Sequence, residues 1–179
     1  MRTMLTAVVT IMAMAFAVAV TADDEEAGML AAGDRMVDFE LEAHDGTVVR
    51  SSDLEGTPYL MYFYPKADTP GCTKEACELR DAWSELSDLG LEVFGVSYDS
   101  PKDNAKFAEK YALPFRLLSD SDRELAKRVG AARALLPVPK RISYLVGADG
   151  TVLKAYPSVD PKTHDDEVLA DFRALTASP

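Results

Sequence analysis

Residues 59–77 read YLMYFYPKADTPGCTKEAC and contain three local patterns in succession. The first six residues are apolar and are closed by Pro65, which is typical of a short strand covered on both faces. A loop rich in proline and glycine follows. From Cys72 onward, apolar residues recur at intervals of three or four, as on one face of an amphipathic helix that continues to Leu86 and is capped by Gly90. The stretch therefore predicts a buried strand, a turn, and a helix that begins near a cysteine.

The alternation of strands and helices continues on both sides of this stretch. Upstream, residues 39–47 indicate a small hairpin. The downstream pattern first predicts a strand over 91–97, a helix from the capping Ser100 to about Tyr111, and a strand over 115–118. A short helix follows, opened by the capping-box sequence 121–124 and closed by Gly130. The chain then forms a hairpin of 141–146 and 151–156 around a turn at 149–150, and ends in a helix with an apolar stripe at 168–175. Crossover units with a closing hairpin predict one α/β domain, with a central mixed β-sheet and helices on both faces.

Composition excludes several classes of function. The 179 residues are 47% apolar and 27% charged, which fits one globular domain. The net charge of -11 would repel a phosphate backbone, so no nucleic acid is expected as a partner. Two cysteines and two histidines are too few for a disulfide-dense scaffold, an iron–sulfur cluster or a repeated zinc module.

The N-terminal segment has the pattern of an export signal. Arg2 precedes an uncharged run that ends at Ala22, before four acidic residues. We expect 1–22 to be a signal peptide, 23–32 a flexible acidic lead and 33–179 the folded domain. The expected location is outside the cytoplasm, in the periplasm. If the leader were kept, its uncharged run could instead anchor the chain in a membrane.

Cys72 is the candidate nucleophile. The start of a helix offers free backbone N–H groups and the positive end of the helix dipole, both of which favour a thiolate. Thr69 can direct its hydroxyl toward the sulfur or toward a bound oxygen substrate, and Pro65, which has no backbone donor, can shield the pocket.

Cys77 follows five residues later, and helix geometry limits how the two sulfurs can react. Five helical steps separate their Cα atoms by about 8.6 Å, whereas a disulfide needs about 7 Å or less. A pair that must unwind a helix to join is suited to a switch. A plain stabilising disulfide is the alternative, although so short a loop would constrain the unfolded chain little. A zinc site that also used His44 and His164 lacks the usual ligand spacing, and we interpret both histidines as surface or turn residues.

Residues 65–77 resemble the active-site segment of the peroxiredoxins, Pro-x-x-x-Thr-x-x-Cys, in the bacterioferritin-comigratory or peroxiredoxin Q branch. Further similar segments are 33–39, 62–65, 118–120 and 141–146. The resemblance implies a thioredoxin-like fold and no metal or organic cofactor. It also implies roles for five residues: Cys72 as the peroxidatic nucleophile, Cys77 as the resolving thiol, Pro65 and Thr69 as the pocket, and Arg141 as the cation that supports the thiolate and polarises the peroxide.

The resemblance implies a thiol-dependent peroxidase that reduces hydrogen peroxide and organic hydroperoxides. Cys72 would become a sulfenic acid, Cys77 would resolve it as an intramolecular disulfide, and a thioredoxin-like or other dithiol reductant would restore the pair. We expect a monomer. The alternatives are an exported thiol–disulfide oxidoreductase or redox sensor, and a binding module of the same fold without enzymatic activity. Residues 131–140 are shorter and richer in proline than the family segment, which bears on substrate preference and on dimer contacts.

Overall fold

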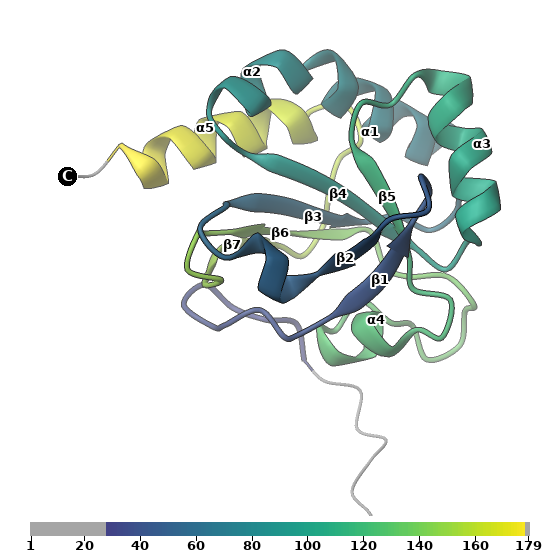
Figure 1. Ribbon diagram of the computed structural model, residues 1–179. Coiled ribbons are helices and arrows are strands. Elements are labelled where there is room, and N and C mark those ends of the chain that lie inside the picture. The colour runs from purple at the N-terminus through teal and green to yellow at the C-terminus, as the bar shows by residue number, and fades with distance from the viewer. Residues whose placement is uncertain (1–27, 178–179) are drawn as a thin grey trace, which may run out of the picture.

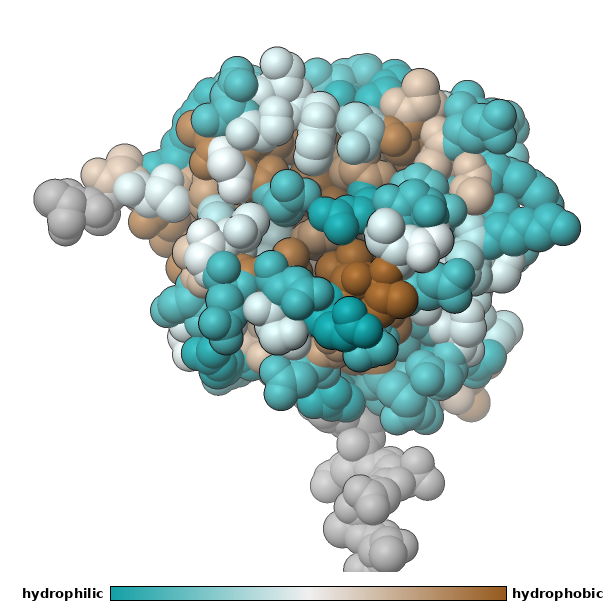
Figure 2. All heavy atoms as spheres, in the orientation of Figure 1, coloured by the Kyte–Doolittle hydropathy of each residue, from teal (hydrophilic) through white to brown (hydrophobic). Residues whose placement is uncertain are grey.

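The computed structural model describes residues 28–177 (Figure 1). The expected signal peptide and the first half of the expected acidic lead, residues 23–27, lie outside this part of the chain. Within it, no helix is long and apolar enough to cross a membrane. Hydrophilic side chains cover most of the face shown in Figure 2, in keeping with the net charge of -11.

Seven strands form one mixed sheet in the order β2-β1-β5-β4-β3-β6-β7. The central strands β3, β4 and β5 are parallel, and every other neighbouring pair is antiparallel. Both predicted hairpins, β1-β2 and β6-β7, are confirmed. The strands are β1 (Glu40–Ala43), β2 (Val48–Arg50), β3 (Tyr59–Phe63), β4 (Glu92–Ser97), β5 (Arg116–Ser119), β6 (Ile142–Val146) and β7 (Val152–Tyr156).

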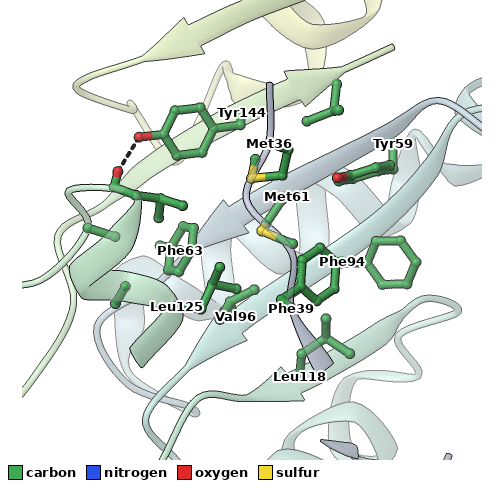
Figure 3. Packing of buried hydrophobic residues seen from close by; sticks show 14 of the residues in the cluster. Met36, Phe39, Tyr59, Met61, Phe63, Phe94, Val96, Leu118, Leu125 and Tyr144 are labelled. Atoms are coloured by element: carbon green, nitrogen blue, oxygen red, sulfur yellow. Dashed lines mark hydrogen bonds between the residues drawn. The ribbon is translucent and has the colours of Figure 1, made fainter. Parts of the chain in front are cut away.

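Helices cover both faces of the sheet, as predicted (Figure 1). One face carries α1 (Pro70–Asp81), α2 (Trp83–Asp88), α3 (Pro101–Tyr111) and α5 (His164–Thr176), whose apolar sides form one buried cluster with β3. The other face packs on α4 (Glu124–Arg128) and the 3-10 turn η1 (Ser51–Leu54), which form a second cluster (Figure 3). Each strand of the centre is therefore buried on both sides, as its continuous apolar sequence requires.

Two local predictions are wrong in detail. The helix expected from Cys72 to Leu86 is two helices, because the backbone at Ala82 (φ -82°, ψ -4°) tightens between α1 and α2. The expected capping box does not start α4. Its N-cap is Arg123, in a left-handed conformation (φ 67°), and the buried carboxylate of Asp120 accepts hydrogen bonds from the backbone N–H groups of Leu125 and Ala126.

The cap at the start of α3 is confirmed. The Ser100 hydroxyl accepts a hydrogen bond from the backbone N–H of Asp103 at 3.2 Å, and Pro101 occupies the first helical position.

Candidate active site

The fold brings the candidate residues together at the end of β3. The chain leaves this strand at Phe63, passes through the loop 64–69 and enters α1 at Pro70. The start of β6 lies beside the same point, since Ile142 pairs with Phe63 in the antiparallel register. Arg141, which directly precedes β6, is therefore placed next to the first turn of α1 although 69 residues separate it from Cys72.

Cys72, Arg141 and Glu75 form a continuous chain of contacts. The Nη2 group of Arg141 lies 3.2 Å from Cys72 Sγ, and its Nη1 group binds the Glu75 carboxylate. Cys72 is 1% exposed and Glu75 is fully buried. The planar guanidinium thus contacts the sulfur through Nη2 and the buried Glu75 carboxylate through Nη1, a geometry that a lysine could not reproduce. The contact sets a fixed positive charge against the sulfur.

The pKa values of Glu75 and Arg141 are set by burial and by the attraction between the two groups. Burial raises the pKa of Glu75 to about 7, although the attraction and hydrogen bond of Arg141 pull it down. Burial by itself would lower the pKa of Arg141, but Glu75 and Cys72 more than offset this effect, so its pKa is raised. Arg141 therefore stays a cation, while Glu75 is the member of the pair that can take a proton near neutral pH.

Gly71 allows the guanidinium to reach the sulfur. A Cβ atom at this position would lie 3.3 Å from Arg141 Nη2, which is tighter than nearly all ordinary contacts. The absence of a side chain at Gly71 therefore sets how closely Arg141 approaches the start of α1.

The loop before α1 is held from two sides. Asp99 accepts a hydrogen bond from the backbone N–H of Ala67 at 2.8 Å. Asp68 has a left-handed backbone (φ 58°), and its carboxylate accepts hydrogen bonds from Lys110 Nζ at 2.7 Å and from the Tyr111 hydroxyl at 2.6 Å. Half-buried Thr69 is the N-cap residue of α1, and its hydroxyl donates to the Lys66 carbonyl at 2.9 Å. These bonds fix the loop that carries Thr69 beside Cys72.

Both cysteines lie in α1, which confirms the helical arrangement used to estimate their separation. Neither is in a disulfide; Cys72 is buried and Cys77 is half-buried. Pro65, also half-buried, directly follows the buried Tyr64 at the end of β3. The structure thus brings Arg141 into contact with Cys72 in the first turn of α1, where Thr69 is the N-cap, and leaves Cys77 more than a turn away on the same helix. Pro65 begins the loop that leads into this helix.

Comparison with known proteins places this arrangement in a family. The sequence profile of the AhpC/TSA family matches residues 32–155. The chain belongs to the AhpC/TSA family. The relatives are peroxiredoxins, so the identification from the sequence is confirmed, and with it the enzyme class of thiol peroxidases.

Several similar peroxiredoxins cover most of this chain. Peroxiredoxin Bcp of Escherichia coli is 41% identical over 146 residues, which are 78% of this chain and 94% of that protein. The crystal structure of peroxidoxin BcpB from Mycobacterium tuberculosis covers 81% of this chain and 97% of its own, with 37% identity and a TM-score of 0.75. The bacterioferritin comigratory protein of Xanthomonas campestris covers 76% and 90%, with 30% identity and a TM-score of 0.73. These likenesses also confirm the thioredoxin-like peroxiredoxin fold.

The histidines of this peroxiredoxin are not both surface residues. His44 is half-buried in the turn after β1, where its Nδ1 atom accepts from the backbone N–H of Leu117 at 3.0 Å. His164 is 1% exposed, and its Nε2 atom lies 2.9 Å from the Ser143 hydroxyl. Its burial, with a smaller effect of Arg141, lowers its pKa to about 4. The expectation of an exposed His164 is therefore wrong. His164 is the first residue of α5, and it is buried because the apolar side of this helix packs against the core.

The described residues 28–177 contain no group of three or more histidine, cysteine or acidic side chains that could hold a metal ion. The zinc alternative, with Cys72, Cys77, His44 and His164 as its ligands, is thus not supported by their placement.

Glu75 is the site residue that sequence reasoning missed. It lies three residues after Cys72, a spacing that places two side chains on one face of a helix. That spacing was available in the sequence, but a glutamate in a helix rich in charged residues is ordinarily solvated. Only the structure shows it fully buried against Arg141, with its second oxygen and the nearby Tyr62 hydroxyl unpaired within the described residues.

Proposed function

We propose that Cys72 is the peroxidatic nucleophile of a thiol peroxidase that reduces hydrogen peroxide and organic hydroperoxides. The contact of 3.2 Å between Arg141 Nη2 and Cys72 Sγ carries the proposal, because it sets a fixed cation where negative charge is held before reaction and redistributed during it. A bacterioferritin comigratory protein of similar structure is described by its alkyl peroxide reduction activity, which supports the organic substrates.

In the first step the Cys72 thiolate attacks the terminal oxygen of the hydroperoxide ROOH. The O–O bond breaks as the S–O bond forms, and the leaving alkoxide takes a proton to become ROH. Cys72 is oxidised to a sulfenic acid and the peroxide is reduced. Arg141 stabilises the developing charge. The Thr69 hydroxyl donates to the Lys66 carbonyl, so its lone pairs are left to accept a hydrogen bond from the peroxide O–H.

In the second step Cys77 attacks the sulfenic sulfur, which releases water and leaves an intramolecular disulfide. Helical geometry keeps the two Cα atoms about 8.6 Å apart, beyond the reach of a disulfide. We therefore infer that the first turns of α1 unwind before resolution. A thioredoxin-type dithiol then reduces the disulfide by exchange and is itself oxidised to a disulfide.

The test is stopped-flow oxidation of the reduced protein, with intact mass measured in parallel. The wild type loses two hydrogens per chain and turns over with a dithiol. Cys72→Ser consumes no peroxide, and Cys77→Ser takes up one oxygen and halts. Undiminished thiol-dependent peroxidase activity in Cys72→Ser would overturn the proposal. If the wild type exchanged disulfides rapidly but consumed peroxide only once, the alternative of a thiol–disulfide oxidoreductase or redox sensor would replace it.

We also propose that the chain is exported and that the leader 1–22 is removed, because Arg2, the uncharged run and the small residues before Ala22 fit a cleavable signal. N-terminal sequencing of the protein isolated from a periplasmic fraction tests this. A mature chain that begins within a few residues of Asp23 is expected. Recovery of the intact N-terminus in a membrane fraction would instead favour the anchor, and recovery from the cytoplasm would exclude export.

A further inference from the structure

The loop between α4 and β6, residues 131–140, carries two exposed leucines and ends where the chain enters the active site. Leu135 is 94% exposed and Leu136 51%, the two highest values among the large apolar side chains of residues 28–177. The loop ends at Lys140, directly before the arginine that contacts Cys72. A molecule that covered the two leucines would therefore contact the loop that leads directly into the active site at Arg141.

The base of this loop is closed by hydrogen bonds, which leave its tip exposed. The backbone N–H of Lys140 donates to the Ala131 carbonyl at 2.7 Å and closes the loop, and Tyr144 holds the preceding turn by donating to the Val129 carbonyl (Figure 3). None of these groups belongs to α1. The loop can therefore keep its place while α1 unwinds to form the disulfide.

The stretch of sequence that contains the loop is basic, although the whole chain is acidic. Residues 125–148 contain five basic side chains and no acidic one, in a protein of net charge -11. Two of the five are neutralised, Lys127 by Glu124 and Arg141 by Glu75. Within residues 28–177 the other three donate to carbonyl oxygens and form no ion pair: Arg128 donates to that of Asp38, Arg133 to that of Pro139 and Lys140 to that of Gly130. Their charges remain available to an approaching anion.

We propose that the tip Leu135-Leu136 and the cations Arg128, Arg133 and Lys140 form the docking surface for the reductant, an acidic thioredoxin-type dithiol protein with an apolar rim around its attacking thiol. This inference rests on the proposed peroxidase function. The cations steer an acidic partner toward one side of an otherwise repelling molecule, and the two leucines supply apolar area that the partner covers.

The test separates docking from chemistry by measuring each half-reaction of the full-length chain. Peroxide oxidation is followed first, since its failure would refute the proposed function and not the docking. The disulfide form is then reduced either by an acidic thioredoxin or by dithiothreitol, which needs no docking surface. Leu135→Ser/Leu136→Ser is compared with Leu175→Ser, a control 46% exposed near the end of α5.

We expect the double variant to be reduced by thioredoxin about tenfold or more slowly than wild type, the loss typical of removing an interface hot spot. Its rates with dithiothreitol and with peroxide stay within about twofold, and Leu175→Ser behaves as wild type. Arg133→Glu slows the thioredoxin step several-fold at low ionic strength and less at high ionic strength, because salt screens steering.

Four results would overturn the proposal. Equal slowing with dithiothreitol would show that the loop shapes the site itself. An unchanged thioredoxin rate in the double variant, or a wild type that thioredoxin reduces no faster than dithiothreitol, would exclude this surface as the docking site. A dimer in sedimentation velocity that the leucine substitutions dissociate would assign the tip to a second copy of the chain.

Discussion

Replacing Arg141 by glutamine removes the cation from two partners at once, and a second substitution tells the two effects apart. At 3.2 Å from Cys72 Sγ, a unit charge interacts with a thiolate by about 5 kcal/mol at an effective dielectric constant of 20. Water screens part of this interaction energy, because the Arg141 side chain is 19% exposed to solvent. Loss of one electrostatic stabiliser of this kind lowers a rate about 10²–10³-fold. We expect kcat/KM for hydrogen peroxide to fall by that factor in Arg141→Gln.

The same substitution leaves the Glu75 carboxylate buried without its cation. Breaking one partner of a buried pair destabilises a protein by about 3–5 kcal/mol. The loss is smaller at low pH, since the folded-state pKa of Glu75 is raised above its ordinary value. For an acid of this kind stability is retained below the ordinary pKa and is lost as pH rises through the folded-state value. Arg141→Gln should therefore unfold at a lower urea concentration at pH 8 than at pH 5.

The double variant Arg141→Gln/Glu75→Gln removes the stranded charge. It should regain most of the stability lost at pH 8 but none of the peroxidase rate. Urea unfolding of the reduced protein measures the first quantity and stopped-flow oxidation the second, with Glu75→Gln as the control. Recovery of the rate in the double variant would refute the reasoning, because Arg141 would then matter only as the counter-ion of Glu75.

The remaining predictions concern backbone approach and acid stability. Gly71→Ala adds a Cβ 3.3 Å from Arg141 Nη2, so kcat/KM for peroxide should fall about tenfold while the fold is retained; a rate equal to wild type in stopped-flow would show that the guanidinium adjusts freely. His164→Gln tests the buried imidazole, whose folded-state pKa of about 4 lies below its ordinary 6.5. A base with a depressed pKa gives stability that is lost as pH falls from about 6.5 to 4, on the order of 3 kcal/mol here. Denaturation at pH 7 and 4.5 should show a smaller acid loss in the variant, and an equal loss would place the acid sensitivity elsewhere.

Local patterns were enough to predict most of the secondary structure. The apolar run at β3, the capped start of α3 and the turn between β6 and β7 each follow from interactions among neighbouring residues, which the sequence displays directly. The predictions that were wrong depend on groups outside the local pattern. The N-terminus of α4 is held by Asp120, one residue before the expected capping box, and His164 is buried because α5 packs on the sheet.

By itself the sequence determined that two cysteines share one helix, that they are five positions apart, and that a Pro- and Gly-rich loop precedes them. These are properties of spacing, and helix geometry turns them into distances. The resemblance implied that Arg141 supports Cys72, and the structure supplies the contact itself. Only the tertiary structure decided that Glu75 is buried against Arg141 rather than solvated, and that Leu135 is left uncovered. The physical reason is that these contacts join residues distant along the chain through the register of β3 and β6, and burial is a property of the packed whole.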